Sequence, residues 1–234
     1  QQITYKENEK GWDYGMGVYF RNKCTALLAS GIENIKVYAV FEKEYENLIV
    51  TFVDKSNHGN DETIVFHEPS NSWTMKCSFI PEYYGTNKKV LVMAKGGRLW
   101  KANAGSDRNT FFGVKYKSEI ELVGHEQPDK TYVFNDIGIV TNSSDWEAPN
   151  TGDVQVNLIN GTMKSRLKKG RFTDREGVMV ATFGKDMTTS GVALQQDLIT
   201  GRELRGHAIN VRLENASTDE VILTAININS TDSE

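Results

Sequence analysis

Short stretches rich in β-branched and aromatic residues recur between residues 35 and 123, and each ends in a turn containing Gly, Asn or Asp. The first four are residues 35–41 (IKVYAVF), 48–53 (LIVTFV), 63–67 (TIVFH) and 73–79 (WTMKCSF). Runs of this length and composition, separated by polar loops, predict two successive β-hairpins.

The same pattern continues toward the middle of the chain. Residues 90–94 (VLVMA) and 99–101 (LWK) flank the turn Lys95-Gly96-Gly97-Arg98, where the two glycines supply the positive φ angles of a two-residue hairpin turn. We expect further strands in residues 110–116 and 118–123. In the last of these, apolar and polar residues alternate, which predicts one buried face and one wet face.

The chain changes character at the polar segment 124–129 (GHEQPD), which we take as a domain boundary. Residues 1–124 are then a hairpin-repeat, propeller-blade-like region, and residues 125–234 are a β-sandwich. The predicted strands of the second part are residues 131–140, 154–159, 177–183, 207–213 and 221–228. Helical spacing is confined to residues 192–199, so the predicted fold class is all-β.

Composition adds bounds on function. The chain has 234 residues, 38% hydrophobic and 25% charged, and no uncharged apolar stretch approaches the roughly 20 residues of a membrane-spanning segment. No signal peptide is visible at Gln1, and because the chain begins with Gln we expect a fragment or a processed product. The net charge of −4 disfavours a dedicated nucleic-acid binder.

Positive charge is nevertheless concentrated in one place. The residues concerned, called the basic segment below, are Lys164, Arg166, Lys168, Lys169 and Arg171. Such a run predicts either a patch that meets phosphate or an acidic neighbouring subunit, or a solvated loop or helix face.

No catalytic or cofactor motif is recognisable, so we expect a protein that is not an enzyme and has no cofactor. The four histidines are isolated, without the spacing of a zinc site. Oxygen-bearing side chains around Gly59 allow a calcium loop as an alternative to a plain turn; they belong to Asn57, Asn60, Asp61 and Glu62.

Paired carboxylates leave a glycoside hydrolase as a weaker alternative. The candidates are Glu42, Glu44 and Glu46, or Glu119 and Glu121. A glycosidase requires two carboxyl groups about 5 to 10 Å apart across a cleft, whereas alternation within a strand is more typical of an exposed face.

Cysteines and aromatic residues leave further alternatives open. Cys24 and Cys77 could pair, although two free thiols are the favoured expectation. Eight aromatic residues cluster in the hairpin region, where core packing is favoured over an exposed sugar- or partner-binding set. They are Trp73, Phe79, Tyr83, Tyr84, Trp100, Phe111, Phe112 and Tyr116.

An ordered series of short motifs resembles a known family. The series comprises residues 62–74 (ETIVFHEPSNSWT), 78–84 (SFIPEYY), 96–103 (GGRLWKAN), 109–113 (NTFFG), 118–123 (SEIELV), 134–137 (FNDI) and the later R-L-K, R-x-G and E-L-R-G of residues 166–168, 175–177 and 203–206. These motifs and their order are similar to those in the C-terminal region of tail proteins from crAss-like and related podoviruses. The resemblance extends from about Lys36 to the C-terminus. His67 and Ala102 stand where that family often has Asn and His, and residues 45–47 form a less usual turn.

The resemblance implies a muzzle or nozzle subunit of a short phage tail, located in the virion after assembly in the host cytoplasm. Implied partners are other copies in a ring, expected to be hexameric, other tail proteins, and genomic DNA that passes without sequence-specific contact. The basic segment would then form salt links between subunits. The main alternative is a carbohydrate-binding or host-surface recognition module with the same β architecture.

Overall fold

Antiparallel strands dominate the computed structural model, which describes residues 16–124, 130–158, 161–187 and 202–233. The all-β prediction is therefore confirmed, with one α-helix added in the described residues. The chain divides into an amino-terminal unit (residues 1–105 and 111–114) and a carboxy-terminal unit (residues 106–110 and 115–234). No helix in the described part of the chain is long and apolar enough to cross a membrane.

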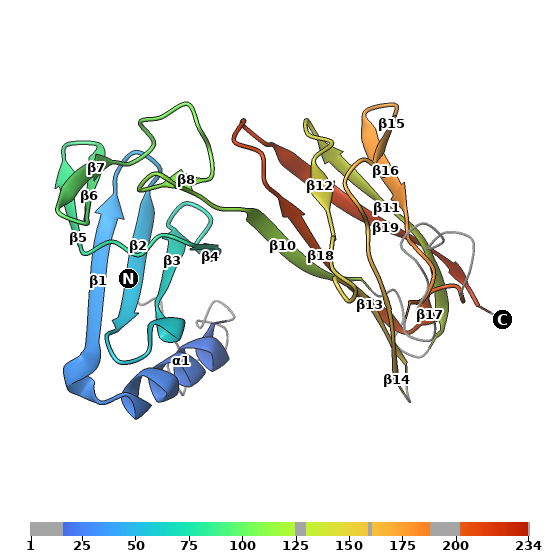
Figure 1. Ribbon diagram of the computed structural model, residues 1–234, viewed down its shortest axis with the longest axis horizontal. Helices are drawn as coiled ribbons and strands as arrows, with labels where there is room; N and C mark the ends of the chain where they lie inside the picture. The colour runs from blue at the N-terminus through green and yellow to red at the C-terminus, as the bar shows by residue number, and fades with distance from the viewer. Residues whose placement is uncertain (1–15, 125–129, 159–160, 188–201, 234) are drawn as a thin grey trace. The chain divides into compact units, whose positions relative to one another are not determined.

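The amino-terminal unit begins with an antiparallel meander in chain order (Figure 1). Its strands are β1 (Ile35–Glu42), β2 (Asn47–Asp54), β3 (Glu62–His67) and β4 (Ser72–Cys77). Short 3₁₀ turns at Ile32–Asn34 and His58–Asn60 precede β1 and β3. The two hairpins predicted first are thus confirmed, within one or two residues at each end.

Helix α1 (Gly17–Ala29) packs on one face of this sheet. Leu27 is buried against Phe52 and Ile64, and the Phe20 ring meets the edge of Trp73 at a centroid distance of 5.2 Å. Polar anchors come from Glu62, which accepts a hydrogen bond from the Tyr19 hydroxyl and pairs with two lysines. The sequence prediction of helical turns only in residues 192–199 missed α1, and those residues lie outside the described part of the chain.

A three-stranded sheet packs on the meander's other face, formed by β5 (Tyr83–Asn87), β6 (Val90–Lys95) and β7 (Arg98–Lys101). Its inner residues include Tyr84 and Met93, which are buried with Ile49 of β2. The Gly96-Gly97 turn has φ angles of 60° and 71°, as predicted from the hairpin signal.

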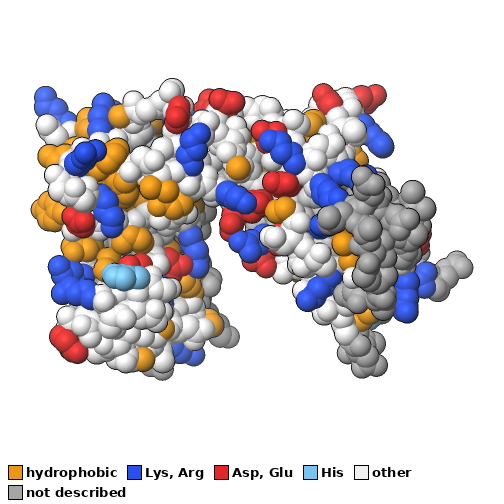
Figure 2. All heavy atoms as spheres, viewed as in Figure 1, with side chains coloured by type: hydrophobic (Ala, Val, Ile, Leu, Met, Phe, Trp, Pro, Cys, Tyr) orange, Lys and Arg blue, Asp and Glu red, His pale blue; other side chains and the backbone are white. Residues whose placement is uncertain are grey.

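The outer face of this small sheet is apolar and open. Register places Tyr83, Ala94 and Leu99 side by side across the three strands. Tyr83 and Leu99 are 66% and 79% exposed, and Figure 2 shows hydrophobic side chains gathered over β5–β7. Most of the aromatic cluster packs in the core, as expected, and Tyr83 is its clear exception.

A buried chain of hydroxyl groups joins the two sheets. The Thr63 hydroxyl donates to the Phe79 carbonyl oxygen at 2.7 Å, so it must accept from Thr51, also at 2.7 Å. Thr51 in turn accepts from the Tyr84 hydroxyl at 2.6 Å. Burial raises the pKa of Tyr84 to about 12, which keeps this donor protonated.

We expect Thr51→Val to lower the free energy of unfolding by about 1–3 kcal/mol, because it removes the buried hydroxyl that bonds to both Tyr84 and Thr63. Tyr84→Phe removes only the terminal donor and should cost less. Urea titrations of both variants, with the exposed Thr86→Val as control, measure the difference. A Thr51→Val cost no larger than that of Thr86→Val would contradict the hydroxyl chain.

The carboxy-terminal unit consists of two five-stranded sheets around one hydrophobic core (Figure 1). One sheet contains β10 (Ser118–Gly124), β12 (Trp146–Glu147), β13 (Val154–Leu158), β14 (Gly161–Ser165) and β18 (Ala208–Asn215). The other contains β11 (Tyr132–Thr141), β15 (Thr173–Arg175), β16 (Val178–Thr182), β17 (Arg205–Gly206) and β19 (Leu223–Asp232). Ile137 and Ile139 from β11 and Leu213 from β18 are fully buried in this shared core.

Two expectations differ from the observed fold. Residues 110–116 form a two-stranded hairpin, β8 (Thr110–Phe111) and β9 (Val114–Lys115), and not one strand. The division between units lies near residues 105–115 and not at 124, because all of β10 pairs with β18. The described strands of the amino-terminal unit form one four-stranded meander and one smaller sheet.

Candidate functional site

The basic segment begins in strand β14, which pairs with β13 among the described strands, and the Lys164 carbonyl oxygen also accepts from the Met187 N–H at 2.8 Å. Lys164, Arg166 and Lys168 are each partly exposed, whereas the intervening Ser165 and Leu167 are buried. The backbone of Leu167 also pairs with that of Ala148 in both directions. Lys164 is therefore the one cation of the segment within β14; Arg166 and Lys168 flank the bridged Leu167, and Lys169 and Arg171 lie in and after the next turn.

Part of this positive charge is matched within the chain. The Lys169 ammonium lies 3.1 Å from Asp145 Oδ1, and the Lys169 backbone N–H donates to Glu147 Oε2 at 3.2 Å. Arg171 is exposed and makes no ion pair with the described residues. Lys169 of the basic segment therefore already has acidic neighbours within the chain.

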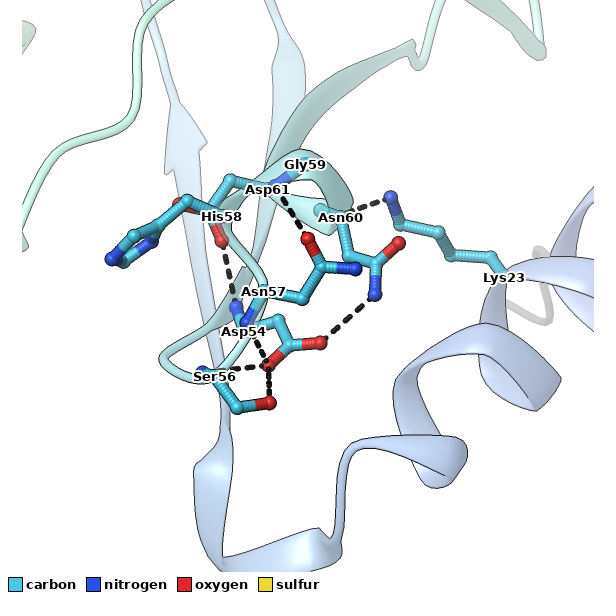
Figure 3. Close-up of polar contacts among 8 residues, drawn as sticks. All are labelled: Lys23, Asp54, Ser56, Asn57, His58, Gly59, Asn60 and Asp61. Atoms are coloured by element: carbon cyan, nitrogen blue, oxygen red, sulfur yellow. Dashed lines mark hydrogen bonds and ion pairs between the residues drawn. The ribbon is translucent and has the colours of Figure 1, made fainter.

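The loop after β2 is organised by the carboxylate of Asp54, which is fully buried (Figure 3). Asp54 Oδ1 accepts from the Ser56 and Asn57 backbone N–H groups at 2.9 and 3.0 Å, and Oδ2 accepts from the Asn60 amide at 2.9 Å. Hydrogen bonds from the Ser30, Asn60 and Ser56 side chains lower the pKa of Asp54 below its ordinary value. Asp54, which the sequence analysis did not single out, is the residue that fixes this loop.

The oxygens suggested for calcium are directed to partners within the protein. Asn57 Oδ1 accepts from the Gly59 N–H at 3.1 Å, and the Asn60 amide donates to Asp54 (Figure 3). Asp61 accepts from the Asp54 N–H at 2.7 Å and contacts His58 Nδ1 at 2.9 Å. Glu62 is held by Lys23 and Lys76. These side chains build a hydrogen-bonded turn and do not converge on one point.

The other carboxylate candidates differ in their partners and in their exposure. Glu119 pairs with Arg212 at 2.7 Å, and Glu121 accepts from the Asn210 amide at 2.8 Å, both on the exposed face of β10. Ile120 and Leu122 pack against the core, which confirms the predicted alternation. Glu42 is buried, and burial raises its pKa; Glu44 and Glu46 are exposed.

Both cysteines are free thiols in the structure. Cys24 is exposed on α1, and Cys77 is half-buried at the end of β4. Burial raises the pKa of Cys77 to about 11, so its thiol stays protonated at neutral pH.

A groove of about 460 Å³ opens at one end of the amino-terminal unit. Its walls are largely apolar and come from Tyr38, Val53, Ile80 and Pro81. The loop after β2, which Asp54 fixes, contributes His58 and Asp61 to the same groove. Its volume is in the range of small-molecule sites.

Three lysines line this groove from different elements: Lys36 from β1, Lys55 after β2, and Lys95 at the end of β6. We call the site the lysine groove. None of the three ammonium groups pairs with a carboxylate among the described residues. Both carboxylates present are engaged, Asp61 as described and Glu82 by the Gly96 N–H at 3.1 Å. Counting lysines and carboxylates, the lining of the groove therefore has an excess of one positive charge.

No protein-family model matches the chain, and a search of curated proteins finds no match. Function must therefore follow from the chemistry of the basic segment and the lysine groove.

Proposed function

We propose that this chain is a structural subunit of a short-tailed phage tail, a muzzle or nozzle component that assembles in a ring around the ejection channel. The observation that supports it most is the basic segment, of which Lys164 lies in β14 and the other four cations follow that strand. A cluster of cations favours a partner surface of opposite charge. An acidic surface of a neighbouring copy fits that requirement, and the ring would be a closed, head-to-tail assembly.

The motif series supports the same proposal, since it runs through both units of the chain. A negative net charge of −4 also suits a wall past which DNA must slide. The β1–β4 meander has the form of a single propeller blade, and a propeller-like arrangement stays part of this proposal.

Reversing two charges tests the role of the basic segment. We expect Lys168→Glu combined with Lys169→Glu to abolish ring assembly, measured by sedimentation velocity and electron microscopy of the full protein, because it turns attraction to an acidic partner into repulsion. The matched control is Lys88→Glu with Lys89→Glu, an adjacent exposed pair between β5 and β6. Intact rings from the first variant, with circular dichroism confirming its folding, would count against the proposal.

A host-surface recognition module is the second candidate, and the lysine groove is the observation that favours it. A tail component can both assemble and bind the host surface. Because the two functions are assigned to different sites, experiments can test them separately. Binding of the purified full protein to a glycan array is the direct test. An array without any bound glycan would remove this candidate while leaving ring assembly untouched.

A further inference from the structure

We propose that the lysine groove binds an acidic saccharide, a sugar that carries a carboxylate or phosphate group. This inference rests on the second candidate function and names both its site and its ligand class. The lysines would hold the anionic group, and the apolar walls would cover the sugar ring.

Charge is the first argument for an anion. Lys36, Lys55 and Lys95 enter the groove without carboxylate partners among the described residues, and the two carboxylates in the lining accept hydrogen bonds from the protein itself. The three ammonium groups outnumber the two lining carboxylates, Asp61 and Glu82, by one, and this excess of positive charge around a concavity raises the local concentration of anions. A ligand with a carboxylate or phosphate would relieve their mutual repulsion.

The walls provide the second argument, because their apolar surface fits a ligand with a non-polar face better than it fits a bare inorganic anion. Tyr38, Val53 and Pro81 present non-polar surface, and the Tyr38 ring also brings a hydroxyl that can hydrogen-bond. A ligand that covers these walls needs a non-polar face of its own, with hydroxyl groups at its edge. A sugar ring has both.

Rigidity is the third argument. The Asp54 hydrogen bonds hold the loop that carries Lys55 and His58, and strand pairing holds Lys36 opposite Val53. Groups held in place before binding lose little conformational freedom when the ligand arrives.

The test is a calorimetric titration of the full protein with defined probes: a glucuronate-containing tetrasaccharide, glucose 6-phosphate, and neutral cellotetraose. We expect binding of at least one acidic probe, with affinity that falls as sodium chloride is raised, and no binding of cellotetraose. Binding of the tetrasaccharide alone identifies an acidic polysaccharide as the source, and binding of glucose 6-phosphate alone identifies a phosphorylated sugar.

Variants locate the site. Lys36→Gln with Lys95→Gln should weaken binding of the acidic probe about tenfold, whereas Lys101→Gln, an exposed lysine on β7 outside the groove, should not change it. Three results would overturn the inference: equal binding of cellotetraose, equal weakening by Lys101→Gln, or inorganic phosphate or duplex DNA binding as tightly as the sugars. Glycan binding that survives Lys36→Gln with Lys95→Gln would reject this groove and keep the recognition function.

Discussion

Replacing Leu213 with alanine should lower the free energy of unfolding of the carboxy-terminal unit by about 2–5 kcal/mol. Leu213 is fully buried on β18, opposite Ile120 of β10, in the core that both sheets share. Truncation removes its contacts and leaves a cavity that paired strands on either side cannot close by moving inward. Because a domain is stabilised by only about 5–15 kcal/mol, this single change should be visible as a large shift of the unfolding midpoint.

Urea titration followed by circular dichroism measures the effect, and Leu99→Ala is the matched control. Leu99 undergoes the same deletion on β7, where it is 79% exposed, so its expected cost is within about 0.5 kcal/mol. Similar costs for the two leucines would mean that the two sheets of the carboxy-terminal unit do not form one packed core.

Strands in this chain follow from local side-chain patterns, which is why most of them could be predicted. In β10, Ile120 and Leu122 face the core, and Glu119 and Glu121 face solvent. Because that alternation is a local pattern, the strand can be predicted without any knowledge of distant residues. By contrast, β5 contains Gly85 and Asn87 and is extended because it pairs with β6, so composition alone did not indicate it.

Helix α1 was missed for a related reason. Val18 and Leu28 are 66% and 61% exposed, so the apolar residues of α1 do not mark one buried face. The helix is held instead by contacts with the sheet, among them the Tyr19 bond to Glu62, 43 residues away. Pairings at that separation leave no periodic signal.

The two candidate sites differ in the same way. The basic segment is continuous in sequence, so counting charges was enough to find it. The backbone conformation of its residues could not be predicted in that way. The lysine groove collects Lys36, Lys55 and Lys95 from three separate elements, and only the packing of the two amino-terminal sheets brings them to one place. Its loop depends on Asp54, which reads in sequence as an ordinary turn residue.

Glu62→Gln should destabilise the amino-terminal unit by about 2–3 kcal/mol at pH 7. Lys23 and Lys76 lie 2.9 and 2.6 Å from the two Glu62 oxygens, and the side chains of Lys23 and Glu62 are only 12% and 18% exposed. Removing the carboxylate leaves the shielded Lys23 ammonium without its counter-charge, with a hydrogen bond to the Asn60 carbonyl oxygen at 2.6 Å. Breaking a buried pair by removing one partner is costly because a charge is left uncompensated.

The pH dependence follows from the pKa of the same carboxyl group. Burial by itself would raise this pKa. Three hydrogen bonds, from Lys76, Tyr19 and Lys23, together have the larger effect and lower the pKa from 4.5 to about 2. A carboxyl whose pKa is depressed in the folded state contributes stability above pH 4.5 and loses it as the pH falls toward 2. The stability difference between the native protein and Glu62→Gln should therefore be full at pH 7 and shrink between pH 4.5 and 2.

Glu119→Gln separates this effect from that of an ordinary ion pair. Glu119 lies 2.7 Å from Arg212, and both side chains are nearly half exposed, so we expect a cost of no more than about 1 kcal/mol. Urea titrations of the three proteins at pH 7, 4 and 2.5 give the comparison. An equal cost for Glu62→Gln and Glu119→Gln, or a Glu62→Gln cost that does not shrink on acidification, would show that α1 is held to the sheet by its apolar contacts alone, through Leu27 and Phe20. The expected result instead makes Glu62 the residue that docks the helix, by ion pairs that only the folded sheet can assemble.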